Sequence, residues 1–199
     1  MGYYIRVLAT DTIPIMVTDL RGCLPSDVEL DIQDKDESGW SQLVLRHRGG
    51  LEIAAIERNP VTPGELGGEE IAEFVEEAKR GKPESAARWL ESYLVRVKTI
   101  YAFQLLRGTD VNDGWAAVHA VQRFIWGKCG GILQADSEGF SNEDGYNILW
   151  QFADTVKGDW NMAVLSAQGQ WVQFEMNLGD TEQRSAFLEG LVPKGAKLL

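Results

Sequence analysis

Residues 97–135 read VKTIYAFQLLRGTDVNDGWAAVHAVQRFIWGKCGGILQA, and their pattern predicts a strand, a helix and a second strand. In the first part, apolar side chains fall on both sides of an extended chain, because successive side chains of a strand point to opposite faces. A strand that is apolar on both faces is typical of the middle of a sheet that helices cover. We therefore expect the fold to be organised around this strand.

The middle of this stretch predicts a helix. Asn112 or Asp113 can accept hydrogen bonds from the free N–H groups of a first helical turn. Apolar residues then recur at three- and four-residue spacing, at Ala117, Val118, Val121 and Ile125. The pair Gly130-Gly131 favours a left-handed helix end, and extended structure resumes at Ile132. A connection of this length suits a right-handed crossover, so the two strands are predicted to be parallel, either adjacent or with another strand between them.

The rest of the chain predicts further strands and helices. Alternating patterns predict strands at residues 3–9, 28–33, 40–46, 51–58, 148–152, 160–166 and 170–178, and helical spacing predicts helices at 69–81, 83–94 and 181–189. A polar connection is expected at residues 34–39, residues 12–25 carry no clear pattern, and residues 193–199 are expected to be loose.

This order of elements predicts an α+β fold. We expect a mixed, largely antiparallel sheet with helices on one face and ferredoxin-like elements around the central strand–helix–strand unit. The alternative is two small sheets side by side. The domain prediction is a single domain over residues 1–199, with a division into subdomains 1–95 and 96–199 as the alternative.

Composition limits the classes of function. The chain has 199 residues, of which 44% are hydrophobic, and its formal net charge is −11. This charge argues against nucleic acid as a partner and favours a basic protein, although acidic proteins also use their charge for solubility alone. No signal peptide or apolar run of membrane-spanning length is found, so a cytoplasmic protein without a membrane partner is expected. In a reducing compartment, Cys23 and Cys129 are predicted to be free, buried side chains.

Acidic residues follow both strands of the central unit. In a parallel crossover, the loop after the first strand and the end of the second strand lie at the same sheet edge, so four carboxylates could converge there: Asp110, Asp113, Asp136 and Glu138. Paired carboxylates could serve acid/base chemistry or hold a divalent cation. The alternative is that the first two cap a helix and the last two lie in a turn. The spacing does not match an EF-hand, and no metal or cofactor is predicted.

Other catalytic motifs are missing from the sequence. His47 and His119 are accompanied by no GxSxG or Cys-His pattern, so a catalytic triad has no support. The glycine pairs match neither GxxxxGK[ST] nor GxGxxG, so nucleotide binding has no support either. Five tryptophans in the second half could stack on sugars or anchor a partner, but tryptophan is more often buried between sheet and helix.

The segment VKTIYAFQLLRGTDVNDGWAAVHAVQRFIWGKCGGILQADSEGF resembles segments of uncharacterised bacterial proteins. Some of these are similar to the immunity proteins of toxin systems, in which a helix ending in Gly-Gly leads to a strand and an acidic loop. The resemblance covers less than a quarter of the chain and carries over no site residue. It implies an immunity-type binding role.

Two hypotheses of function follow. The first is a non-catalytic binding protein whose acidic face and aromatic residues engage a basic protein partner. The second is a metal-assisted hydrolase that uses the four convergent carboxylates. Edge strands of the predicted sheet also make a homodimer plausible.

Overall fold

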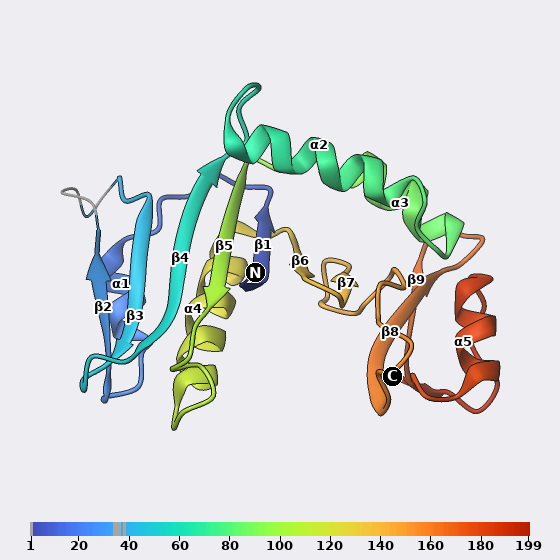
Figure 1. Cartoon of the computed structure of the whole chain (residues 1–199). Coiled ribbons are helices and arrows are strands. Elements are labelled where there is room, and N and C mark those ends of the chain that lie inside the picture. Colours follow the sequence, from blue (N-terminus) through green and yellow to red (C-terminus); the bar gives the residue numbers. More distant parts are fainter. Residues whose placement is uncertain (1, 34–36, 38) are drawn as a thin grey trace. The chain divides into compact units, whose positions relative to one another are not determined.

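The computed structural model describes residues 2–33, 37 and 39–199, so most of the predicted connection at 34–39 lies outside the described residues (Figure 1). The described residues form five helices and ten strands, which confirms the predicted α+β class and the largely antiparallel pairing. The chain divides into two compact units of interleaved segments. The first comprises Met1–Glu69 and Val97–Gly131, and the second comprises Glu70–Arg96 and Ile132–Leu199.

The first unit is a five-stranded sheet with two helices. Its elements are β1 (Tyr3–Ala9), α1 (Val17–Gly22), β2 (Val28–Ile32), β3 (Gln42–His47), β4 (Glu52–Pro60), β5 (Thr99–Leu105) and α4 (Gly114–Cys129). The strand order within this unit is β2-β3-β4-β5-β1, and every neighbouring pair is antiparallel. Strands β2, β3 and β4 were each predicted from their alternating patterns, and β5 lies inside the sheet, as its apolar faces predicted.

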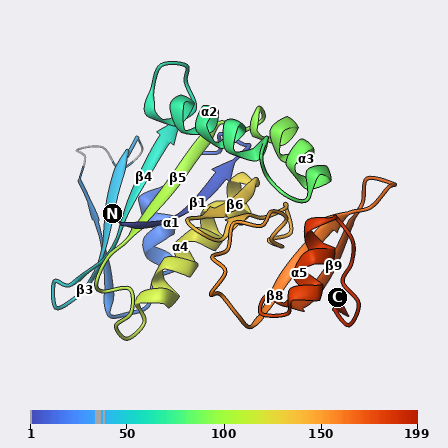
Figure 2. The same cartoon turned by 45° about the vertical axis from the view of Figure 1, so that its right-hand side comes forward.

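One face of this sheet is more apolar than the other, which mixes polar side chains with the buried Leu8, Ile100 and Ala102. The strand register aligns Ile5, Phe103, Ile56 and Leu43 in one row, and all four are buried. The next row along the strands, on the opposite face, includes Arg6, Glu57 and Gln42. Helices α1 and α4 lie on the same side of the sheet (Figures 1 and 2). Helix α4 buries the predicted apolar stripe, because the apolar face of the sheet needs a cover of matching polarity.

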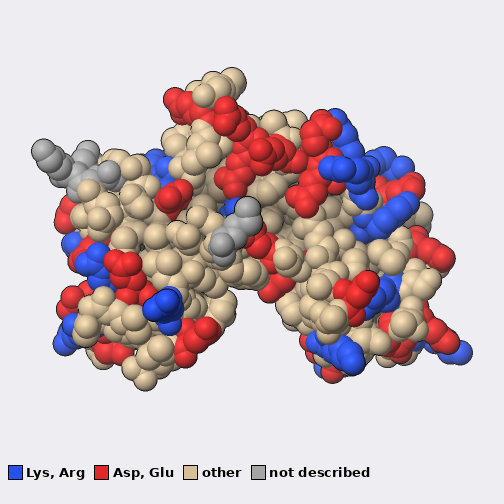
Figure 3. Space-filling view, in the orientation of Figure 1, with Lys and Arg blue, Asp and Glu red and all other residues tan. Residues whose placement is uncertain are grey.

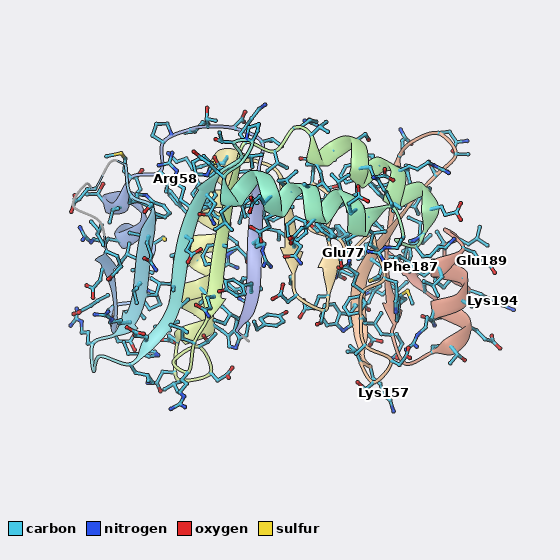
Figure 4. The ribbon with its side chains drawn as sticks, turned by 45° about the horizontal axis from the view of Figure 1, so that its top comes forward. Arg58, Glu77, Lys157, Phe187, Glu189 and Lys194 are labelled. Atoms are coloured by element: carbon cyan, nitrogen blue, oxygen red, sulfur yellow. The ribbon has the colours of Figure 1, made fainter. Side chains whose placement is uncertain are left out.

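The second unit contains two long helices and a smaller sheet. Its elements are β6 (Ile132–Ala135), β7 (Gly139–Phe140), α3 (Glu84–Leu94), β8 (Asp159–Leu165), β9 (Trp171–Asn177), α5 (Thr181–Leu188) and β10 (Lys197–Leu198), together with most of α2 (Leu66–Ala78). Strands β6 and β7 form an antiparallel pair, and β10, β9 and β8 form a three-stranded sheet in that order. Phe187 of α5 points toward β8 and β9, whereas Glu189 and Lys194 point away (Figure 4).

Two local predictions were wrong, and one helix formed where none was predicted. Residues 148–152 form no strand. The N–H of Ile148 donates to the carbonyl of Phe140, whereas that of Trp150 donates to the carbonyl of Lys82. These hydrogen bonds go to different segments, so they do not form a β-ladder. The expected loose tail instead contains β10, which pairs with β9. Residues 17–22, where no pattern was recognised, form α1, because Val17 and Leu20 are buried within one short turn of helix. None of the helices among the described residues has the length and apolarity to cross a membrane.

Candidate functional site

Two of the four predicted carboxylates lie in the loop that connects β5 to α4. Asp110 is exposed and accepts a hydrogen bond from the indole Nε1 of Trp115 at 3.0 Å. Asp113 is exposed and occupies the N-cap position of α4, but its side chain makes no capping hydrogen bond. The predicted position of this cap was therefore correct and the predicted bond is not made. The loop is tight, because a Cβ at Gly114 would lie 2.3 Å from the carbonyl oxygen of Gly108.

The other two carboxylates, Asp136 and Glu138, lie in the turn between β6 and β7. Both are half-buried and both take part in interactions with other groups. The N–H of Glu138 donates to the carbonyl of Ala135 at 3.1 Å, and Ser137 between the two carboxylates has a φ of 62°. The structure thus places the four residues as two sequence-local pairs, one in each unit. The parallel orientation of β5 and β6, and the convergence of the two pairs, stay predictions.

Helix α2 carries a run of exposed carboxylates that the sequence pattern only outlined. Its 13 residues include five glutamates and neither lysine nor arginine. We define the acidic stripe as Glu69, Glu73 and Glu77, which all lie in α2, are exposed and follow one another at four-residue spacing. Because a helix rises 1.5 Å per residue, neighbouring members lie about 6 Å apart along the axis. Figure 3 shows the red carboxylates gathered over this helix.

The acidic stripe is not neutralised by the chain itself. Among the described residues, no lysine or arginine forms an ion pair with any member of the stripe, and Glu76 of α2 pairs with Lys79 instead. Like charges four residues apart on a helix destabilise it by about 0.2–0.5 kcal/mol per pair. The stripe therefore weakens α2, while the buried side chains of Ile71 and Phe74 hold the opposite side of the helix.

A cavity of about 280 Å³ lies where α2 leads into α3, and the sequence analysis did not anticipate it. Its lining residues are Lys79, Arg80, Gly81, Lys82, Glu84, Ala87, Arg88 and Glu91. Four cationic side chains against two carboxylates give the lining a net charge of +2, in a chain whose net charge is −11. The signal in the sequence was the run Lys79-Arg80-Gly81-Lys82, which concentrates three cations in four residues.

Two residues of the lining have shifted pKa values, and in each case the main cause is the hydrogen bond to its ion-pair partner. The hydrogen bond from Lys82 lowers the pKa of Glu84, and the hydrogen bond to Glu76 raises the pKa of Lys79. The Lys82 ammonium lies 2.5 Å from the Glu84 carboxylate. Both pairs are exposed to solvent, so water screens them and their contribution to stability is small.

A third polar group lies inside the first unit. The buried phenol of Tyr101 lies close enough to the Cys129 thiol and the Arg58 guanidinium for both to influence its titration, and burial raises the pKa of Tyr101 to about 12. Burial also raises the pKa of the Cys129 thiol. Tyr101 is 2% exposed and Cys129 is fully buried, so no substrate can reach this thiol in the folded state. The group ties the end of α4 to β4 and β5, and Figure 4 labels Arg58 in it.

The contacts of Cys23, His47 and His119 are those of structural side chains. Cys23 is free, as is Cys129, and its thiol donates to the carbonyl of Leu20 at 3.0 Å. His47 is buried, and its Nε2 lies 3.0 Å from the carbonyl oxygen of Gly108. His119 is exposed on α4, where desolvation and then the charge of Arg123 lower its pKa.

The described residues contain no group of three or more His, Cys, Asp or Glu side chains that could hold a metal ion. Comparison of the chain with protein-family models, with curated proteins and with solved structures finds no match. The arguments for function therefore depend on the residues and geometry described above.

Proposed function

We propose that this chain is a non-catalytic binding protein that engages a basic protein partner through the acidic stripe of α2. The observation that carries the proposal is the four-residue spacing along one helix of three exposed glutamates without ion pairs in the described part of the chain. A surface of one sign of charge attracts a partner of the opposite sign and raises its association rate. A basic partner would also relieve the repulsion between neighbouring glutamates, so binding would stabilise α2.

Two features favour a partner over solubility as the reason for the stripe. Charge that serves solubility alone is spread over a surface with both signs interspersed. In α2 the five glutamates are concentrated within 13 residues without a single cation. The immunity-type role implied by the sequence resemblance is of the same class, since it is also a binding role. No specific observation favours the metal-assisted hydrolase, which stays a prediction from sequence, as does the homodimer.

The test removes charge from the stripe without changing its shape. The double variant Glu73→Gln/Glu77→Gln keeps the size of both side chains and the helix propensity. The matched control is Glu182→Gln/Glu189→Gln, which removes the same charge from exposed positions of α5. The tagged full-length chain is used as bait to isolate a basic protein from extracts of the native host. The affinity of that protein for each variant is then measured by titration.

We expect the stripe variant to bind this protein about tenfold more weakly than the unaltered chain, and the control to bind within about twofold, because charge pairs at an interface contribute locally. Raising the salt concentration from about 0.1 M to about 1 M should release the complex, because the Debye length falls from about 10 Å to about 3 Å. Equal affinity of the two double variants, or a complex that salt does not weaken, would contradict the proposal.

A further inference from the structure

We propose that the cavity between the end of α2 and the start of α3 binds a small phosphate-bearing anion. This site is separate from the acidic stripe in residues and opposite to it in charge. Figure 3 shows blue Lys and Arg side chains gathered over this part of the second unit, beside the red side chains of α2. The proposal depends on the charge of the lining, on the start of α3 and on the rigidity of the connection.

Two arginines of the lining, Arg80 and Arg88, make no close ion pair within the described part of the chain, although the charge of Arg88 also helps to lower the pKa of Glu84. Lys82 pairs with Glu84 and Lys79 pairs with Glu76, but among the described residues neither Arg80 nor Arg88 forms an ion pair with a carboxylate. A guanidinium presents a planar set of donors that matches the oxygens of a phosphoryl group. Two such groups at one cavity supply donors for a doubly charged anion.

The start of α3 adds partial positive charge at the same place. This helix has eleven residues and begins at Glu84, and its N-cap residue Pro83 makes no side-chain capping bond. The first N–H groups of a helix lack partners inside the helix, and they attract anions together with the helix dipole. Lys82 and Glu84, on either side of Pro83, both line the cavity, so the start of α3 belongs to its wall.

The connection between the helices is held in place by contacts on its other side. A Cβ at Gly81 would lie 2.9 Å from Cδ2 of the buried Leu149, so any larger residue at this position would have to displace the Leu149 side chain. The carbonyl of Lys82 accepts a hydrogen bond of 2.9 Å from the N–H of Trp150. A lining whose backbone is already fixed loses little conformational entropy when it binds a ligand. The cavity therefore has a defined shape before the anion arrives.

A purely structural role accounts for only part of this arrangement. Cations after the last turn of a helix stabilise its negative end, which explains Lys79 and Arg80 at the end of α2. Arg88 lies in the second turn of α3, where that explanation does not apply. The volume of about 280 Å³ lies near the lower end of the range for small-molecule sites, which suits a compact anion.

Pyrophosphate and inorganic phosphate are the probes, with malonate as a dianion that lacks phosphorus. Amide chemical shifts of the full-length chain are followed at low salt during each titration. We expect saturable shifts confined to residues around the α2–α3 connection, with pyrophosphate binding more tightly than phosphate and malonate binding most weakly. Absence of saturable shifts there, or malonate binding as tightly as pyrophosphate, would overturn the proposal.

Charge-matched variants separate this site from general attraction of anions. The double variant Arg80→Gln/Arg88→Gln should weaken pyrophosphate binding by about tenfold or more. The control Arg107→Gln/Arg123→Gln makes the same change of charge at exposed positions of the first unit, and it should change pyrophosphate binding by less than about twofold. Conversely, Glu91→Gln removes a lining carboxylate and should tighten binding by about threefold, with Glu189→Gln as its control. Equal effects of the paired variants would show that the anion does not bind in the cavity.

Discussion

The two units bury their apolar side chains in different ways. In the first, long antiparallel strands align buried rows that are mainly aliphatic, and helix α4 covers them. In the second, the sheet has three strands, one of which has two residues, and aromatic rings share its core with aliphatic side chains: Phe152, Phe174 and Phe187 are buried beside Met162, Val164, Met176 and Leu178, and Trp150 and Trp160 pack against them. A small sheet offers few positions that face its core, so each must bury a larger side chain.

The difference extends to the loops. In the second unit, residues between β7 and β8 follow an irregular path that side chains hold in place. Arg184 of α5 stacks on Trp150 at 4.7 Å from the ring centre and lies 2.8 Å from the carboxylate of Asp154. The amide oxygen of the buried Asn142 accepts hydrogen bonds from the N–H groups of Asp144 and Tyr146. The first unit depends more on its ladders, and the second depends more on individual side chains.

The largest predicted effect comes from truncating one core ring in each unit. Phe187→Ala and Phe103→Ala each remove a fully buried phenyl ring, and each should lower the free energy of unfolding by about 3–5 kcal/mol, from lost burial and the cavity left behind. Hydrogen exchange resolved by peptide should show lost protection first in the second unit for Phe187→Ala and first in the first unit for Phe103→Ala. If both variants lost protection in both units at the same time, the two units would unfold as one cooperative structure. The contrast between the units would then not hold.

A second prediction concerns the dependence of stability on pH. Burial raises the pKa of Tyr101 to about 12, so the unfolded chain releases this proton at a lower pH than the folded chain. Stability from this group is complete below about pH 10 and falls as the pH rises toward 12, by up to about 2–3 kcal/mol. Denaturant unfolding followed over this range should show the loss in the unaltered chain.

The variant Tyr101→Phe is the control for this prediction, because it keeps the ring and removes the titrating group. The difference in unfolding free energy between the two chains should shrink as the pH rises above about 10. A difference that stays constant with pH would mean that Tyr101 titrates like an exposed tyrosine.

The smallest predicted effect compares two aspartates at the starts of helices. Asp180 accepts hydrogen bonds from the N–H groups of Glu182 and Gln183 at the start of α5, whereas Asp113 accepts none at the start of α4. Asp180→Ala should therefore lower the unfolding free energy by about 1 kcal/mol, and Asp113→Ala by less than about 0.5 kcal/mol. Denaturation midpoints measure both. A larger effect at Asp113 would point to a role for this carboxylate that the present geometry does not show.

Local patterns predicted most of the elements. The alternation at residues 3–9, the stripe on α4 and the helix near residues 181–189 were all confirmed, because each depends only on neighbours in the chain. The segment at 148–152 misled the prediction because Ile148, Leu149 and Phe152 are buried as in a strand, but their backbone has no partner strand. Strand β10 was missed because both of its residues are exposed and carry no alternation.

The candidate sites were predicted less completely. The sequence placed Asp110 near Asp113 and Asp136 near Glu138, because the members of each pair are close in the chain. Whether the two pairs come together depends on the tertiary structure. The glutamates of α2 stand in the sequence, but the exposure of the acidic stripe came only from the structure. The cationic cavity was missed because the net charge of −11 averages over the whole chain and hides a local excess of lysine and arginine.

By itself, the sequence of this protein determined its class, most of its helices and strands, and the sign of its overall charge, because periodicity and composition depend on residues close together in the chain. Only the tertiary structure decided that two interleaved sets of segments form the two compact units, and that Arg88 shares a cavity with Arg80. The physical reason is that such neighbours are set by the packing of buried side chains, as where Leu149 fills the space beside Gly81, and packing depends on segments far apart in the chain.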